Sequence, residues 1–308
     1  MRAVGVTDFG GPEALKIIDV PAEALGRGDV RLRVRAATVN PTDTQLRAGA
    51  YEAYYPDAAA PWIPGMELAG EVVELGDGVD HLEIGDLAMG IVVPYGAYRD
   101  EKVLPGNSVV RAPADTDAVA AATLPMNGLT ARRALDLMAL KRGQVLAVTG
   151  AAGAFGGYVV ELAKNEGLTV VADASEPDES LVRGFGADIV VRRGEGVAQR
   201  IRDHFPNGVD GLADGALQGP EVLPAVADGG AVATVRNYEG DGQRGLRVHP
   251  VLVSKMAENR EALDRLRQLV EDGKLTLRVA QTFSAEDAAE AHRRLEQGGT
   301  RGRIVLTF

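Results

Sequence analysis

Between residues 144 and 235 the chain alternates short apolar runs with segments whose apolar residues recur every three or four positions. The runs have the length of buried strands, and the periodic segments have the spacing of amphipathic helices. The strand-like runs are 144–149, 169–173, 188–191, 209–213 and 231–235, and the helix-like segments between them are 155–166, 177–185, 197–204 and 222–227. This alternation predicts βαβ units with right-handed crossovers, and hence an α/β fold with a doubly wound parallel sheet.

The first 115 residues have a different pattern, in which short strand-like runs are separated by glycine and proline. Val30, Leu32 and Val34 alternate with arginines, which predicts a half-buried strand with one solvated face. Further strand-like runs occupy 66–75 and 87–93. Short strands with many turns predict a small barrel-like domain.

The C-terminal segment again mixes helix and strand patterns. It predicts a helix that ends at Gly273, a strand from the alternation over 275–279, a second helix that opens with a capping pair, and a final strand over 304–308. Because this ending resembles the beginning of the chain, we expect it to return to the first domain. The predicted domains are a β-rich domain formed by 1–115 and 252–308 and an inserted domain, 116–251.

A segment of small residues follows the first apolar run and leads into a helical pattern. There a pyrophosphate can approach the backbone and bind N–H groups at a helix N-terminus. Asp173, twenty residues after Gly153, stands where an acid that binds the ribose is expected. The alternative is a glycine turn that serves packing only. We predict a dinucleotide-binding turn made of Gly150, Ala151, Gly153, Ala154, Phe155 and Gly156.

Composition narrows the range of partners. The formal net charge of −11 disfavours nucleic acid, because phosphate binding requires clustered cationic side chains. The chain has no cysteine, which excludes disulfides and thiolate metal sites and fits a cytoplasmic protein. No apolar run has the length of a membrane span, and the N-terminus lacks the apolar region of a signal peptide. We therefore expect a cytoplasmic protein with neither nucleic acid nor membrane as a partner.

Short motifs in a consistent order and spacing cover nearly the whole chain. With them the chain resembles the medium-chain dehydrogenase/reductase superfamily, in its zinc-independent quinone oxidoreductase (zeta-crystallin-like) branch. The resemblance implies a Rossmann domain inserted in a discontinuous GroES-like domain, which agrees with the pattern above. The motifs are Phe9–Leu15, Val39–Asp43, Pro64–Gly70, Gly85–Asp86, Leu124–Pro125 with Leu129–Thr130, Gly150–Gly156 and Gly302–Leu306.

The residues at the family's metal site differ from those of its zinc-dependent members. Those members carry Gly-His-Glu where this chain has Gly65-Met66-Glu67, and their other ligands include cysteines. The four histidines of this chain lack the spacing of metal ligands, and we expect each to lie at the surface or at an edge. We therefore expect a reaction that does not use zinc. Reduction of an electron-poor quinone or an activated alkene needs a Lewis acid less than alcohol oxidation does.

The resemblance also implies catalytic residues. Asn40 matches an asparagine that binds the cofactor's nicotinamide end or the substrate, and Tyr51 matches a tyrosine that can donate a proton in related enoyl reductases. The alternatives are a turn at the end of a strand for Asn40 and a hydrophobic patch for Tyr51. Tyr54, Tyr55 and Trp62 would either belong to that patch or form an apolar wall of the substrate pocket.

Two further residues are implied near the nicotinamide. Thr130 matches a family position beside it, and Asn127 lies close to Thr130 in the sequence. Helix capping or a loop hydrogen bond is the alternative role for both side chains.

The choice between NADPH and NADH depends on residues after the second predicted Rossmann strand. Asp173 favours NADH if its carboxylate accepts a hydrogen bond from a free ribose 2′-OH, but it could also point away or pair with an arginine. Ser175 and Arg193 match positions at which relatives bind the 2′-phosphate, which a guanidinium can clamp with paired hydrogen bonds. Arg192 and Arg193 could equally be solvated loop charges. We expect NADPH, with NADH as the alternative.

These observations favour an NADPH-dependent oxidoreductase that transfers a hydride to a quinone or an α,β-unsaturated carbonyl compound. A 2-enoyl thioester reductase of the same superfamily is the second enzymatic hypothesis. An NADPH-binding sensor or regulatory protein is the non-enzymatic one. The resemblance further implies a homodimer.

Overall fold

The computed structural model describes residues 1–51, 60–235 and 238–308. The contacts within the chain define two compact units, each discontinuous in sequence. The first consists of Met1–Met126, Ala257–Glu271 and Leu277–Phe308, and the second of Asn127–Met256 and Asp272–Thr276. Helix α2 (Ala118–Ala121), which follows the predicted boundary at residue 115, lies in the first unit.

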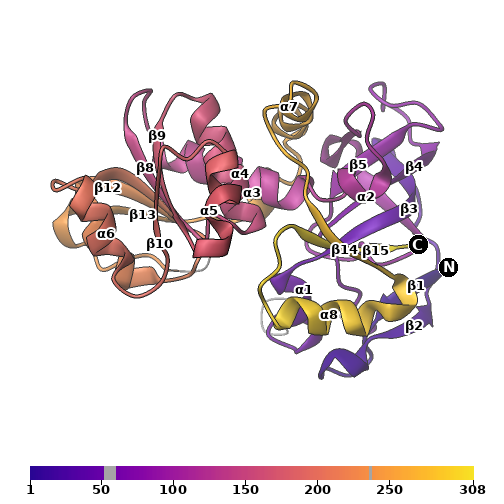
Figure 1. Cartoon of the computed structure of the whole chain (residues 1–308). Coiled ribbons are helices and arrows are strands. Elements are labelled where there is room, and N and C mark those ends of the chain that lie inside the picture. Colours follow the sequence, from indigo (N-terminus) through magenta and orange to yellow (C-terminus); the bar gives the residue numbers. More distant parts are fainter. Residues whose placement is uncertain (52–59, 236–237) are drawn as a thin grey trace. The chain divides into compact units, whose positions relative to one another are not determined.

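A seven-stranded sheet forms the centre of the first unit (Figure 1). Its strand order is β14-β15-β3-β4-β5-β7, and β6 also pairs with β3. The strands are β3 (Asp29–Val39), β4 (Glu67–Leu75), β5 (Leu87–Ile91), β6 (Glu101–Pro105), β7 (Val109–Arg111), β14 (Val279–Ser284) and β15 (Arg303–Thr307). Strand β15 runs antiparallel to β3 with Ile304 opposite Val39, so the expected return of the C-terminal tail to the first domain is confirmed.

Shorter elements complete this unit. Strands β1 (Arg2–Gly5) and β2 (Lys16–Asp19) form a separate antiparallel pair. The helices are α1 (Pro41–Arg47), α2, α7 (Arg260–Glu271) and α8 (Ala288–Glu296), with 3₁₀ turns η1 (Pro12–Ala14), η3 (Gly106–Ser108) and η8 (Ala285–Asp287).

One predicted strand of the C-terminal segment is wrong. The alternation of Leu275, Leu277 and Val279 predicted a strand, but β14 begins only at Val279. Leu275 is buried and belongs to the second unit, whereas Leu277 belongs to the first. The alternation therefore arises from residues that pack in different units and does not mark the two faces of one strand.

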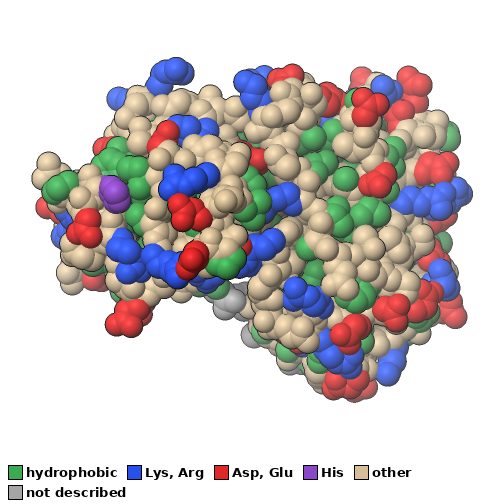
Figure 2. Space-filling view, in the orientation of Figure 1, with side chains coloured by type: hydrophobic (Ala, Val, Ile, Leu, Met, Phe, Trp, Pro, Cys, Tyr) green, Lys and Arg blue, Asp and Glu red, His purple; other side chains and the backbone are tan. Residues whose placement is uncertain are grey.

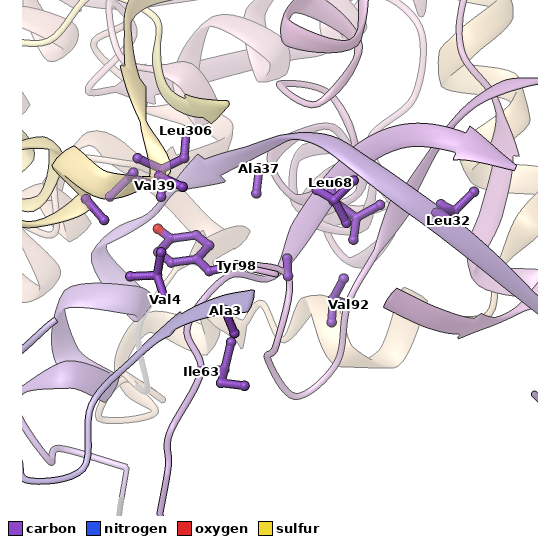
Figure 3. Packing of buried hydrophobic residues seen from close by; sticks show 14 of the residues in the cluster. Ala3, Val4, Leu32, Ala37, Val39, Ile63, Leu68, Val92, Tyr98 and Leu306 are labelled. Atoms are coloured by element: carbon purple, nitrogen blue, oxygen red, sulfur yellow. The ribbon is translucent and has the colours of Figure 1, made fainter. Parts of the chain in front are cut away.

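The hydrophobic core of the first unit includes buried side chains from the strands of its sheet. Figure 3 shows Tyr98 among Val4, Val39 and Leu306, and all four are buried. The Tyr98 hydroxyl donates to the Asp43 carboxylate at 3.3 Å. A tyrosine satisfies its polar end in this way when its ring is buried.

The second unit contains a six-stranded sheet in which every neighbouring pair is parallel, as predicted. Its strand order is β10-β9-β8-β11-β12-β13. The strands are β8 (Val145–Thr149), β9 (Thr169–Ala174), β10 (Ile189–Arg192), β11 (Val209–Asp214), β12 (Val226–Thr234) and β13 (Arg247–Pro250). In Figure 1, α6 lies on one side of this sheet and α4 and α5 lie on the other, which is the doubly wound arrangement.

The helical elements of this unit differ from the prediction at one place. The segment 222–227 was predicted as an α-helix, but η5 (Gly219–Ala225) is a 3₁₀ helix with Pro224 inside it. Proline removes a backbone donor and clashes with the preceding turn, so an α-helix cannot continue there. The remaining helices are α3 (Pro125–Met138), α4 (Ala154–Asn165), α5 (Glu179–Gly184) and α6 (Val197–His204), with 3₁₀ turns η4 (Glu176–Asp178), η6 (Gln243–Gly245) and η7 (Val253–Met256).

Candidate dinucleotide-binding site and active site

The turn between β8 and α4 has the geometry that its small residues predict. Gly150 adopts a φ of +67°, a left-handed conformation that favours glycine. A Cβ atom on Gly156 would lie 2.4 Å from the carbonyl oxygen of Gly150, so α4 packs against the turn too closely for any side chain there. Gly153 is the N-cap residue of α4 and contributes no side chain to that helix end. The turn therefore presents backbone where a pyrophosphate binds in dinucleotide folds.

Two residues that sequence reasoning missed hold the neighbouring strand end. The Thr149 hydroxyl donates to Asp214 at 2.8 Å, and the other carboxylate oxygen of Asp214 accepts the N–H of Gly219 at 2.8 Å. Thr149 and Asp214 are also register partners at the ends of β8 and β11. This is the carboxyl edge of the sheet, where open α/β folds bind ligands. A signal was present, because a polar residue directly follows each apolar run.

Asp173 lies inside β9, one residue before the strand ends. Its side chain is buried, and its carboxylate accepts the N–H of Ala151 at 3.2 Å. Burial raises the pKa of Asp173 above its ordinary value, while the N–H groups of Ala151 and Gly150 and the charge of Arg193 act in the opposite direction. The carboxylate thus faces the glycine turn.

Ser175 and Arg193 lie beyond the ends of β9 and β10. Ser175 is half-buried, and its hydroxyl donates to the carboxylate of Asp178. Arg193 is exposed, and its backbone N–H donates to the carbonyl of Ala174 at 2.9 Å. The structure therefore brings Asp173, Ser175 and Arg193 together with the glycine turn at one edge of the sheet.

Two further predicted site residues of the second unit are Asn127 and Thr130. Both lie on α3, three positions apart, and both are half-buried. Residues at this spacing share one face of a helix.

Asn40 in the first unit belongs to a buried polar cluster. It is the N-cap residue of α1 and 1% exposed, and its N–H donates to the Asp43 carboxylate at 2.8 Å. Its side-chain oxygen accepts a hydrogen bond from Arg303 at 2.7 Å, and its amide nitrogen donates to Thr38 at 3.2 Å. These contacts fix the orientation of the Asn40 amide.

Glu67 and Arg303 are at the centre of this cluster, and sequence reasoning gave neither a role in the site. They form an ion pair with side-chain exposures of 0% and 6%. The other carboxylate oxygen of Glu67 accepts the N–H of Met126 at 2.7 Å, near the start of α3. A charge within an apolar strand is the signal that could have identified them, since buried charges are paired as a rule.

Tyr51 and the aromatic residues predicted near it are only partly described. The Tyr51 hydroxyl donates to Gln45 at 2.8 Å, and the ring is half-buried against the core. Tyr54 and Tyr55 lie outside the described residues. Trp62 is buried, with its ring centroid 5.2 Å from that of Phe9.

One histidine contradicts the expectation of a surface or edge position. His292 is 0% exposed and lies against Arg47 and Tyr98, each 3.4 Å from one of its ring nitrogens. Burial is the largest cause that lowers its pKa to about 3, so the ring is neutral at physiological pH. Burial likewise raises the pKa of Asp43 to about 6. Tyr98 connects these two groups, since its hydroxyl contacts both.

Residues 1–51, 60–235 and 238–308 carry neither a metal-binding cluster nor a membrane-spanning helix. Within those ranges, no group of three or more His, Cys, Asp or Glu side chains is arranged to hold a metal ion. No helix in the same ranges has the length and hydropathy needed to span a membrane.

Comparison with known proteins agrees with this architecture. The family model described as "Alcohol dehydrogenase GroES-like domain" matches residues 26–165, and the one described as "Zinc-binding dehydrogenase" matches residues 185–306. A quinone oxidoreductase of Pseudomonas aeruginosa is 30% identical over 97% of each chain. The polyketide synthase GfsB of Streptomyces halstedii is 33% identical over 92% of this chain, which corresponds to 5% of that protein.

Solved structures share the fold of this chain. The mycobacterial protein Rv1454c, solved in complex with NADPH, is 26% identical, with a TM-score of 0.87 and complete coverage of both chains. Full-length similarity to a quinone oxidoreductase, the two matching domain models and the two observed sheets agree with one another. The chain therefore belongs to the quinone oxidoreductase family of the medium-chain dehydrogenase/reductase superfamily.

Proposed function

We propose that this protein uses NADPH to reduce a quinone or an α,β-unsaturated carbonyl compound. A hydride and a proton are added to the acceptor, and NADPH becomes NADP⁺. The observation that carries the proposal is the strand, glycine turn and helix at residues 145–165, in a chain that is similar over nearly its full length to a quinone oxidoreductase.

The second unit supplies the groups that would hold the dinucleotide. The turn from Gly150 to Gly156 offers backbone N–H groups to the pyrophosphate. Arg193 is exposed at the end of β10 and can bind a 2′-phosphate, with Ser175 beside it. The family resemblance implies a place beside the nicotinamide for Thr130, and we propose the same for Asn127, which shares its face of α3. When bound, the nicotinamide supplies the hydride.

The reaction proceeds without zinc in this proposal. Methionine stands where zinc-dependent relatives have a ligand histidine, and the chain has no cysteine. The adjacent Glu67 carboxylate is occupied by Arg303 and by the N–H of Met126. This donor set does not fit a zinc ion, which binds three or four side chains of Cys, His or carboxylate type.

The first unit supplies the groups that act on the acceptor. Tyr51 delivers a proton through its hydroxyl, which a phenol can do while it hydrogen-bonds a developing oxyanion. Asn40 acts from the buried cluster, in which Arg303 and Thr38 fix the orientation of its amide. A preoriented amide loses little reorganisation energy when charge develops nearby.

Oxidation of NADPH, followed at 340 nm, tests the function with three acceptor classes in parallel: a quinone, an enone and crotonyl thioester. The proposal predicts turnover with the quinone or the enone above that with the thioester. Preference for the thioester would favour the second candidate, an enoyl thioester reductase, which the similarity to a polyketide synthase supports. Tight NADPH binding with no turnover on any acceptor would indicate a sensor and refute the enzymatic proposal.

We also propose a cytoplasmic homodimer that has no nucleic-acid partner. The net charge is −11, and Figure 2 shows acidic side chains interspersed with Lys and Arg on the face drawn. A phosphate backbone binds poorly to such a mixed surface. Sedimentation at micromolar concentration tests the dimer, and a single monomeric species would contradict it.

A further inference from the structure

Asp173 occupies a place that differs from the one expected for a ribose-binding acid. Dinucleotides bind outside the carboxyl ends of the strands, so an acid that contacts the ribose presents its carboxylate to that crevice. Asp173 lies within β9 and pairs in register with Val191 of β10. Ser175 is the first residue after β9, and it is half-buried where Asp173 is only 4% exposed.

The carboxylate of Asp173 has a partner inside the protein. It accepts the N–H of Ala151 at 3.2 Å, and Ala151 is fully buried in the turn. A buried backbone N–H requires an acceptor, and a carboxylate is a strong one. The charged groups near Asp173 are Arg193, which stabilises its negative form, and Asp214, which opposes it.

From this geometry we propose that Asp173 is a positioning residue: it holds the dinucleotide-binding turn in shape through Ala151 and does not select between NADH and NADPH. Selection passes to Ser175 and Arg193, which lie beyond the strand ends. This inference rests on the proposed dinucleotide function.

Three variants separate this role from that of a ribose-binding acid: Asp173→Asn, Asp173→Ala and, as the matched control for selection, Arg193→Ala. Dissociation constants for NADPH and NADH are measured by fluorescence titration of the full-length protein, after circular dichroism has shown that each variant is folded. Asp173→Ala leaves the Ala151 N–H without its acceptor and should weaken both cofactors about tenfold or more by the same factor. Asp173→Asn keeps an acceptor oxygen and should bind both within about threefold of wild type.

The ratio of the two dissociation constants decides the question. It should be unchanged in both Asp173 variants, whereas Arg193→Ala should weaken NADPH about tenfold more than NADH. A gain in NADPH affinity relative to NADH in either Asp173 variant would place the carboxylate at the ribose and overturn the inference. Wild-type affinity of Asp173→Ala for both cofactors would overturn it too.

Asp173→Asn carries the test if Asp173→Ala does not fold, because it removes the charge that would repel a 2′-phosphate while it keeps the side-chain shape. An unchanged ratio in Asp173→Asn then supports the inference, and a shift toward NADPH overturns it. Failure of the wild-type protein to bind either nucleotide would instead overturn the proposed function, so the two failures are distinguishable.

Discussion

Removal of the Arg303 guanidinium should destabilise the first unit more than any surface substitution. Arg303 is 6% exposed and donates to Thr38, to Asn40 and to the fully buried Glu67. Arg303→Met keeps much of the side chain's apolar volume but leaves the Glu67 carboxylate without its counter-ion. Loss of one partner of a buried ion pair costs about 3–5 kcal/mol. Because domains are stable by only about 5–15 kcal/mol, this is a large fraction of the total.

The chain contains a convenient probe for this measurement. Trp62 is its only tryptophan, and it is buried in the first unit beside Phe9. Urea denaturation followed by tryptophan fluorescence therefore reports on the unit that carries Arg303. Arg301→Met is the matched control, because Arg301 is exposed on the neighbouring turn and its loss should change the free energy of unfolding by less than about 0.5 kcal/mol.

A second variant tests the cause. Glu67→Gln in the Arg303→Met background removes the unpaired charge and should recover part of the lost stability. If Arg303→Met unfolds at the same urea concentration as Arg301→Met, the buried pair does not carry the energy assigned to it. If the double variant is no more stable than Arg303→Met, the loss of stability has a cause other than the unpaired, buried charge of Glu67.

Three further predictions follow from the proposed site and the buried cluster. Tyr51→Phe should lower kcat by about 10²-fold, because it removes the proposed proton donor; steady-state rates at saturating NADPH test this, and an unchanged kcat would remove Tyr51 from the mechanism. Gly156→Ala should abolish binding of both nucleotides, since its Cβ would lie 2.4 Å from the Gly150 carbonyl oxygen; ordinary affinity in a titration would contradict the packing described for the turn. His292 has a pKa lowered to about 3 from an ordinary 6.5 by burial, so the unfolded chain takes up a proton that the folded protein does not. The stability that this histidine contributes is present above pH 6.5 and is lost as the pH falls toward 3. The raised pKa of Asp43, about 6, acts in the opposite direction and adds stability as the pH falls below that value. The informative quantity is therefore the difference in unfolding free energy between wild type and His292→Gln, which should shrink as the pH falls from 7 to 4.5; a constant difference would show that His292 is not buried in its neutral form.

The sequence by itself determined the elements whose signals are local. The parallel sheet follows from an alternation of apolar runs and helical periods, and the glycine turn between β8 and α4 follows from small residues between one such run and a helix. The return of the C-terminal tail to the first domain also followed, because the pattern of residues 304–308 resembles that of the first domain, whereas its pairing with β3 came from the structure. These features depend on periodicity and backbone freedom, which neighbouring residues specify.

Only the tertiary structure decided what the polar side chains contact. Glu67 and Arg303 are 236 positions apart in the chain, and His292 reaches Arg47 across 245. No local pattern records such pairs, so the buried histidine was expected at the surface. Asp173 has the sequence spacing of a ribose-binding acid, but strand β9 ends after Ala174 and directs the carboxylate to the N–H of Ala151. The spacing of residues along a chain sets where a strand lies, whereas the partner of a side chain depends on which distant segment packs against that strand.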